Sequence, residues 1–247
     1  MLKSILTEQL ENLQKWKFLR QWLIYWKKKI KLDDKVLDVG CACGHFYRSI
    51  KKRVKKKFYY TGIDPYPIFL QKAKVAWKRD KNVNFIKGNI YKLPFKKNQF
   101  DLSFCSNVFI HLNDIKKPLK EILRVTKKTI VIRTVLYDVS YKIQLVYNNK
   151  WWNDTNVKPS EEFDNNGNPK AYSFFNIHSF DYITANIKKI NPNVKIKIIK
   201  DNFFNKNIIK RSQQKEKRPL STRIVGEEQV SGCILQPHYF LIIDKKK

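Results

Sequence analysis

Long hydrophobic runs are missing from this sequence of 247 residues. Because a helix needs about 20 apolar residues to cross a bilayer, we expect no transmembrane helix. The opening stretch, MLKSILTEQLENLQKW, has Glu and Gln early and no continuous apolar region with a small-residue cleavage site, so we expect no secretory signal either. These two absences together predict a cytoplasmic protein.

Cysteine is also scarce, with four residues at positions 41, 43, 105 and 233. The spacing Cys41-x-Cys43 fits neither the usual zinc-binding pair nor the thioredoxin pair, both of which leave two residues between the cysteines. We therefore expect reduced thiols and no metal site.

Arginine makes up only nine of the 51 basic residues, which face 21 acidic residues and give a net charge of +30. Arginine is the side chain expected where bases and phosphates are read specifically, because its planar fork makes paired hydrogen bonds. Lysine is spread along the whole chain beside many Asn and Ile residues, which also fits a bias toward AT-rich codons. The charge predicts nonspecific binding to polyanions at low salt, and RNA stays open as a physiological partner.

Apolar residues make up 43% of the chain and aromatic residues 14%, enough for a packed core. Between residues 36 and 136, short apolar runs alternate with helix-like stretches, which is typical of a parallel sheet with crossover helices. The predicted strands are Val36–Gly40, Phe58–Asp64, Val83–Ile86, Phe100–Ser106 and Thr129–Leu136. The predicted helices are Phe46–Val54, Ile68–Trp77 and Asp114–Val125, the last with Asp114 as its N-cap.

The pattern divides the chain into four segments. Residues 1–32 carry apolar side chains at helical spacing, and QKWKFLRQWLIYWKKKIK within them is typical either of a membrane-surface helix or of an amphipathic helix packed on the core. Residues 33–136 hold the alternating core, and the aromatic, Asn-rich residues 137–178 indicate an insertion. Residues 179–247 return to regular structure, with a helix at Ser179–Ile190 and the last two strands at Val194–Ile199 and Tyr239–Ile243. The basic stretch at 206–218 predicts a solvated loop.

The strongest motif is the apolar strand, glycine turn and helix start that run from Val36 to Phe46. Glycines at such a turn let a ligand approach the backbone and the helix N-terminus. Neither the G-x-G-x-x-G nucleotide fingerprint nor a P-loop is present. The sequence Asp38-Val-Gly40-Cys-Ala42-Cys-Gly44 instead resembles motif I of the class I, Rossmann-like S-adenosylmethionine-dependent methyltransferases, of the methyltransferase type 11 kind.

This resemblance covers about residues 33–136, with the family's motifs in their usual order. It implies a Rossmann-like α/β fold with a seven-stranded, mostly parallel sheet, helices on both faces and an insertion after strand 5. It also implies S-adenosylmethionine as cofactor and S-adenosylhomocysteine as product. The residues lining the methionine moiety would be Gly40, Cys41, Ala42 and Gly44, with Asp38 near its amino group; Ala42 replaces the usual middle glycine.

The remaining cofactor positions lie at the ends of the next strands. Asp64, at the end of the second strand and followed by Pro65, can accept hydrogen bonds from both ribose hydroxyls. Asn89 stands where the family often has an Asp that takes the adenine amino group, and its amide can both accept and donate. Ile90 would pack on the adenine face, and Ser106 ends the fourth strand beside the reactive methyl group. Structural alternatives remain for Asp64 as a turn former and for Asn89 as a polar loop residue.

Methyl transfer requires the acceptor to lie close to the methyl carbon, and a general base helps when the acceptor is a hydroxyl or a protonated amine. His111 follows the fourth strand and is the candidate base, the alternatives being a contact with substrate or cofactor and a structural role. Side chains that could wall an acceptor pocket, or simply pack the insertion on the core, are Asn107, His111, Tyr137, Trp151, Tyr172 and His178. Glu121 and Arg124 are expected to be surface or structural residues.

The segment after the fourth strand excludes several methyltransferase types. Ser106-Asn-Val-Phe109 lacks the (Asp/Asn)-Pro-Pro-(Tyr/Phe) element of amino-methylating DNA enzymes, and Cys105 lacks the preceding proline of cytosine-5 enzymes. No carboxylate stands there to hold magnesium. We predict transfer to an O or N atom of a small molecule, sugar or lipid-like acceptor. The alternatives are an RNA methyltransferase, and a non-catalytic S-adenosylmethionine-binding protein or aminopropyl-transferring relative; the oligomeric state is left open.

Overall fold

The structure of the protein is a computed structural model that describes residues 29–148, 156–201, 222–225, 228–231, 234–235 and 237–245. Four sequence predictions lie outside these residues: the helix over residues 1–30 (except its last two positions), the pocket residue Trp151, the thiol of Cys233 and the loop at 206–218.

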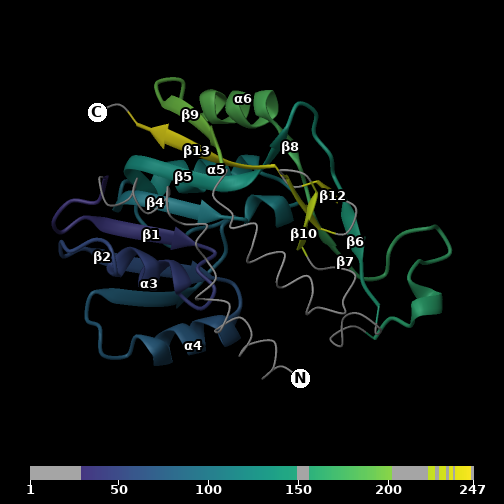
Figure 1. The fold of residues 1–247 in the computed structure, drawn as a ribbon, viewed down its shortest axis with the longest axis horizontal. Helices are drawn as coiled ribbons and strands as arrows, with labels where there is room; N and C mark the ends of the chain where they lie inside the picture. The colour runs from purple at the N-terminus through teal and green to yellow at the C-terminus, as the bar shows by residue number, and fades with distance from the viewer. Residues whose placement is uncertain are drawn as a thin grey trace.

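A single sheet forms the centre of the molecule, with strands in the order β3-β2-β1-β4-β5-β13-β9 (Figure 1). Their bounds are β1 Lys35–Val39, β2 Tyr59–Asp64, β3 Val83–Lys87, β4 Phe100–Ser106, β5 Thr126–Tyr137, β9 Lys195–Lys200 and β13 His238–Asp244. The pairs among β1 to β5 are parallel, whereas β13 runs antiparallel to both β5 and β9. The predicted Rossmann-like, mostly parallel sheet of seven strands is therefore confirmed, and a short strand β8, His178–Ser179, also pairs with β5.

Helices cover both faces of the sheet. The helices are α3 His45–Lys51, α4 Pro67–Ala76, α5 Lys116–Val125 and α6 Phe180–Ile190. Side chains of α3 and α4, such as Phe46 and Leu70, form one buried cluster with the sheet, and those of α5 and α6, such as Leu119 and Ile183, form another. Strand β5 is buried over most of its length, with apolar side chains at Ile130–Ile132, Val135 and Leu136 and the polar Arg133 and Thr134 between them.

Most element ends lie within three residues of their predicted positions. The strand β5 begins at Thr126 rather than Thr129, and a register shift in its pairing with β4 lies between Phe100 and Leu102. Helix α5 begins two residues after Asp114, whose carboxylate nevertheless accepts hydrogen bonds from the backbone N–H of Lys116 and Lys117 at 3.2 and 3.3 Å. The predicted N-cap is therefore wrong by one residue, because Ile115 occupies that position, although Asp114 still satisfies two N–H groups of the first helical turn.

The insertion after β5 contains an antiparallel pair, β6 Gln144–Val146 and β7 Tyr172–Phe174, and a short 3₁₀ helix, η3 Pro159–Glu161. A small antiparallel sheet near the C-terminus was not predicted; its strands are β10 Thr222–Val225, β11 Glu228–Ser231 and β12 Ile234–Leu235. Two to four residues are too few for an alternating pattern to stand out in the sequence. Over the described ranges, no helix combines the length and the apolar character needed to cross a membrane.

Candidate active site

The turn between β1 and α3 contains three residues in the left-handed region: Gly40 at φ 79°, Ala42 at φ 44° and Gly44 at φ 74°. Glycine adopts this conformation freely, so Gly40 and Gly44 are unstrained, whereas the Cβ of Ala42 makes its conformation sterically unfavourable. The backbone N–H groups of Gly40 and Cys41 both donate to the carbonyl of Ile63 in β2, at 2.8 and 3.2 Å. The turn is thereby fixed to the neighbouring strand.

Close packing explains the glycines further. A Cβ on Gly40 would lie 2.3 Å from Cγ2 of Val108, which follows β4, and a Cβ on Gly44 would lie 2.7 Å from Cζ of Phe85. The thiol of Cys41 is fully buried and faces Gly62. The predicted contact of Cys41 with the methionine moiety would therefore use its backbone.

Asp64 links the end of β2 to the turn. Its Oδ2 accepts a hydrogen bond from the backbone N–H of Ala42 at 2.9 Å, and its Oδ1 accepts one from Tyr66 at 3.0 Å. Each carboxylate oxygen can accept a second hydrogen bond, so two remain available for a pair of ribose hydroxyls. Pro65, exposed between the two, continues the chain into α4.

Asp38 lies on β1 beneath the turn and is completely buried. Its Oδ2 accepts a hydrogen bond from the Tyr60 hydroxyl, while its Oδ1 has no hydrogen-bond partner among the described residues. Burial raises the pKa of Asp38 well above its usual range, and the negative charge of Asp64 adds to the effect, although the Tyr60 bond opposes it. An unpaired, buried carboxyl oxygen beside the turn suits the predicted proximity to an amino group.

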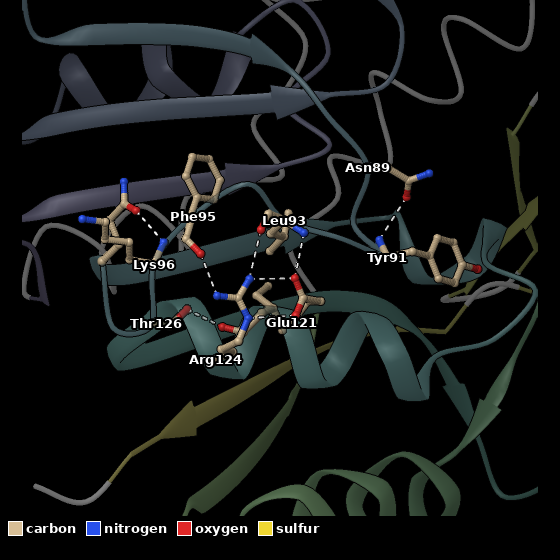
Figure 2. Close-up of polar contacts among 10 residues, drawn as sticks. Asn89, Tyr91, Leu93, Phe95, Lys96, Glu121, Arg124 and Thr126 are labelled. Atoms are coloured by element: carbon tan, nitrogen blue, oxygen red, sulfur yellow. Dashed lines mark hydrogen bonds and ion pairs between the residues drawn. The ribbon is translucent and has the colours of Figure 1, made fainter.

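The loop between β3 and β4 is fixed by a residue pair on α5 (Figure 2). The Arg124 guanidinium donates to the carbonyls of Phe95 and Leu93 at 2.6 and 2.9 Å and pairs with Glu121, which itself accepts from the Leu93 N–H at 2.7 Å. The guanidinium holds the pKa of Glu121 below its usual range. The expected structural role of this pair is confirmed, and it holds in place the loop that carries Asn89.

Within that loop, Asn89 is exposed and its Oδ1 accepts a hydrogen bond from the backbone N–H of Tyr91 at 3.0 Å (Figure 2). The amide nitrogen is therefore the group best placed to meet an adenine ring nitrogen. Ile90 is only 7% exposed and packs in the core cluster under α5, so little of its side chain is left for an adenine face. Both contacts stay predictions.

The segment after β4 carries Ser106, Asn107 and a 3₁₀ turn, η2 Phe109–His111. Ser106 and Asn107 are partly exposed, and His111 is exposed. His111 Nδ1 lies 3.0 Å from the carbonyl oxygen of Phe174 in β7, so the imidazole is attached to the insertion. The structure thus brings the candidate base and the insertion together at the carboxyl end of β4.

The insertion holds the η2 turn by three more hydrogen bonds. Asn176 donates from its backbone N–H to the carbonyl of Ile110 at 2.7 Å and from Nδ2 to the carbonyl of Leu112 at 2.6 Å. His178 is 8% exposed, and its Nε2 lies 3.3 Å from the carbonyl of Phe109. Burial lowers the pKa of His178, which favours a neutral ring. Sequence reasoning missed Asn176, because an asparagine in an Asn-rich insertion gives no signal of its own.

Two other predicted pocket residues stay at the surface. Tyr137, at the end of β5, and Tyr172, in β7, are each 44% exposed. Tyr137 packs against Tyr141 with ring centroids 6.5 Å apart, and Tyr172 packs against Phe174 at 5.4 Å. Their contact with an acceptor stays a prediction, as does that of Trp151. No three His, Cys, Asp or Glu side chains gather to hold a metal ion in the part of the chain that the structure describes.

The candidate site therefore occupies the carboxyl ends of β1, β2 and β4, where ligands bind in open α/β sheets. Three features suit a nucleoside that carries an amino-acid chain. They are a turn with three left-handed residues, a carboxylate at the end of β2 that can accept further hydrogen bonds, and an unpaired, buried carboxyl oxygen on β1 that can accept from an amino group. The residues present thus fit S-adenosylmethionine, and the fold is that of the class I methyltransferases.

Comparisons with known proteins agree. Residues 37–132 match the family model described as a methyltransferase domain. An uncharacterized methyltransferase of Schizosaccharomyces pombe is 36% identical over 111 residues, 42% of this chain and 40% of that protein. The 24-methylenesterol C-methyltransferase 3 of Arabidopsis thaliana is 32% identical over 102 residues, 40% of this chain and 28% of that protein. The chain thus matches less than half the length of either relative.

Among solved structures, the phosphoethanolamine N-methyltransferase 2 of Haemonchus contortus, in complex with S-adenosylmethionine, superposes with a TM-score of 0.60 at 14% identity. The superposition covers 92% of this chain and 52% of that one. Residues 37–132 are thus similar to a methyltransferase domain in sequence, and the fold of the chain is that of S-adenosylmethionine-dependent methyltransferases.

Proposed function

We propose that the protein transfers the methyl group of S-adenosylmethionine to an oxygen or nitrogen atom of a small molecule, sugar or lipid-like acceptor. The observation that carries this proposal is the 3.0 Å contact between His111 Nδ1 and the Phe174 carbonyl. A carbonyl oxygen only accepts hydrogen bonds, so Nδ1 must carry the proton. In the neutral ring, Nε2 then keeps its lone pair and can serve as a base.

In this mechanism the turn backbone at Gly40, Ala42 and Gly44 and the carboxyl groups of Asp38 and Asp64 hold the cofactor. S-adenosylmethionine supplies a methyl carbon made electrophilic by its sulfonium. When bound, this cofactor would supply the methyl group for transfer to the acceptor atom and would retain the sulfur as a neutral thioether. His111 Nε2 takes the proton that the acceptor loses, and the insertion keeps the imidazole oriented through Phe174.

The exposed aromatic side chains of the insertion favour a small acceptor. Tyr137, at the end of β5, and Tyr172, in β7, are exposed, and both of these strands contact the η2 turn that ends at His111. Aromatic walls suit an acceptor with an apolar body and one polar atom. A sterol methyltransferase and a phosphoethanolamine methyltransferase among the similar proteins support a small-molecule or lipid-like acceptor. We therefore interpret residues 137–178 as a substrate cover.

A two-stage experiment tests this function. Calorimetry should first show that the full chain binds S-adenosylmethionine. Protein incubated with cofactor labelled on its methyl group and with lysate fractions of RNA, protein, glycan, lipid and small metabolites should then label the small-molecule or lipid fraction. Binding without any transfer would establish a non-catalytic binding protein, and salt-resistant labelling of RNA alone would replace the acceptor class.

A further inference from the structure

A buried ion pair between Arg133 and Asp201 lies beside the candidate site, and the sequence did not predict it. Arg133 is in β5, and its Nε lies 2.8 Å from Oδ2 of Asp201, the residue that follows β9. The two side chains are only 10% and 2% exposed. The backbone N–H of Asp201 in turn donates to the carbonyl of His238 in β13 at 2.8 Å. The pair is therefore held by three strands that are consecutive in the sheet, in the order β5-β13-β9 (Figure 1).

Arg133 also makes two hydrogen bonds with Asn107, the first residue after β4. Arg133 Nη1 donates to Oδ1 of Asn107 at 2.6 Å, and the Arg133 carbonyl accepts from the Asn107 backbone N–H at 2.9 Å. Asn107 has φ 59°, in the left-handed region that asparagine tolerates better than most residues. Both its backbone and its side chain are thus set by Arg133.

This contact determines which way the Asn107 amide points. A guanidinium has only donors, so the atom facing it must be the amide oxygen, and Nδ2 must point away from it. Within the described ranges, nothing pairs with Nδ2, and Asn107 is partly exposed. The pair therefore leaves an oriented two-hydrogen donor next to Ser106, at the strand end where the proposed transfer takes place.

We propose that Asn107 binds an oxygen atom of a molecule in the site through Nδ2–H, and that Arg133 and Asp201 are positioning residues that orient this donor. The inference rests on the proposed function. A buried ion pair is by itself a weak source of stability, whereas the fork geometry of arginine gives directional control of a neighbour. The bound oxygen belongs either to the cofactor carboxylate or to the methyl acceptor, and these two sources respond differently to substitution.

Asn107→Asp is the informative variant. It keeps an oxygen for Arg133 and the tolerated left-handed backbone but replaces the Nδ2 donor with an acceptor. Because Asn107 is partly exposed, this variant folds even if substitutions of the buried pair do not. Arg133→Lys keeps a charge for Asp201 but loses the fork. Lys128→Met is the matched control, because it also removes a cation of β5 that pairs with carboxylates, but near the start of the strand, with Asp34 and Asp101.

If the oxygen belongs to the cofactor, Asn107→Asp should weaken S-adenosylmethionine binding at least tenfold, and Arg133→Lys should weaken it severalfold. If the oxygen belongs to the acceptor, S-adenosylmethionine binding should stay within twofold, while the KM for the lysate fraction labelled by the wild type rises tenfold or more. Lys128→Met should leave both constants within twofold. Folded Asn107→Asp and Arg133→Lys proteins with both constants unchanged would overturn the proposal.

An activity-independent readout separates this inference from the proposed function. In ¹⁵N-labelled protein, the Asn107 side-chain amide signals, assigned by their loss in Asn107→Asp, should shift in Arg133→Lys but not in Lys128→Met. Unshifted signals would overturn the positioning role even in an active enzyme. A wild type that neither binds S-adenosylmethionine nor transfers label would overturn the proposed function and with it the ligand of Asn107, while a shift would still establish the orientation by Arg133.

Discussion

The backbone N–H of Ala42 donates a hydrogen bond of 2.9 Å to Oδ2 of Asp64, so the turn after β1 and the end of β2 form one unit. Asp64→Ala removes this bond together with the proposed contacts to the ribose. Charge-assisted hydrogen bonds of this kind contribute more than neutral ones, and we expect S-adenosylmethionine affinity to fall by about 1–3 kcal/mol in calorimetry.

Asp164→Ala provides the control for this change. Asp164 also accepts backbone hydrogen bonds, from Asn166 and Asn168 at 2.9 and 2.8 Å, but in a loop of the insertion. Its loss should leave S-adenosylmethionine affinity unchanged. Equal affinities for the Asp64→Ala variant and the wild type would remove Asp64 from the site.

The backbone of the turn makes opposite predictions for two neighbouring substitutions. Ala42 is held at φ 44°, which costs a residue with a Cβ about 1–2 kcal/mol relative to glycine, whereas glycine adds about 0.5–1 kcal/mol of unfolded-state entropy. Ala42→Gly should therefore change the free energy of unfolding by less than about 1 kcal/mol and preserve cofactor binding. Gly40→Ala should reduce both the free energy of unfolding and the affinity for S-adenosylmethionine, because it combines φ 79° with a Cβ that would lie 2.3 Å from Val108.

Urea unfolding and calorimetry measure these two effects. Adding Val108→Ala to Gly40→Ala removes the collision but not the backbone strain, so it should restore only part of the stability. Full restoration would show that φ strain at Gly40 has no role, and a wild-type-like Gly40→Ala would contradict the packing described for this turn.

His111 should affect turnover rather than cofactor affinity. His111→Ala removes Nε2 as the base and should lower kcat by about 10²–10⁴-fold for a hydroxyl or protonated-amine acceptor. The dissociation constant for S-adenosylmethionine, measured in parallel, should stay within about twofold of the wild type. Unchanged turnover would show that another group removes the proton or that none is needed.

His45, the first residue of α3, predicts a pH dependence of stability. Burial lowers the pKa of His45 to about 4, whereas an unfolded histidine titrates near about 6.5. Between these two values the unfolded chain binds the proton and the folded chain does not. The contribution of neutral His45 to the free energy of unfolding is therefore fully present above about pH 6.5. It falls by up to about 3 kcal/mol on acidification toward pH 4.

Urea unfolding between pH 7.5 and 4.5 measures this loss, and the difference between the wild type and His45→Gln isolates the contribution of His45 from those of His178 and the carboxylates. We expect the variant to lose less stability on acidification than the wild type does. Identical slopes for the two proteins would contradict the assignment to His45.

Much of the fold could be predicted because its signals are local. The apolar runs gave the seven strands of the central sheet, and the glycine turn after Val36–Gly40 located the strand end at which the motifs meet. Asp64 could be placed beside that turn because parallel strands end at the same edge of a sheet. The order of β13 and β9 at the other edge was not predicted, because residue patterns locate these two strands without showing which of them pairs with β5.

Other parts of the site depend on contacts between distant segments and could not be predicted. Nothing in the sequence connects Arg133 with Asp201, which are 68 positions apart, or Asn176 with the turn around Ile110. Ile90 was expected at a ligand because its neighbours match a motif, yet the chain turns most of its side chain into the core. Motif spacing indicates which part of the backbone lies at the site, but not whether each side chain points toward the ligand or into the core.

The four hydrogen bonds between Phe174–His178 and the η2 turn have a consequence for engineering. Replacing the insertion, the proposed substrate cover, would also release the turn that carries His111. A chimaera with a foreign insertion would therefore change its preferred acceptor and its proton-transfer geometry at the same time, unless residues equivalent to Asn176 and His178 are transplanted with it.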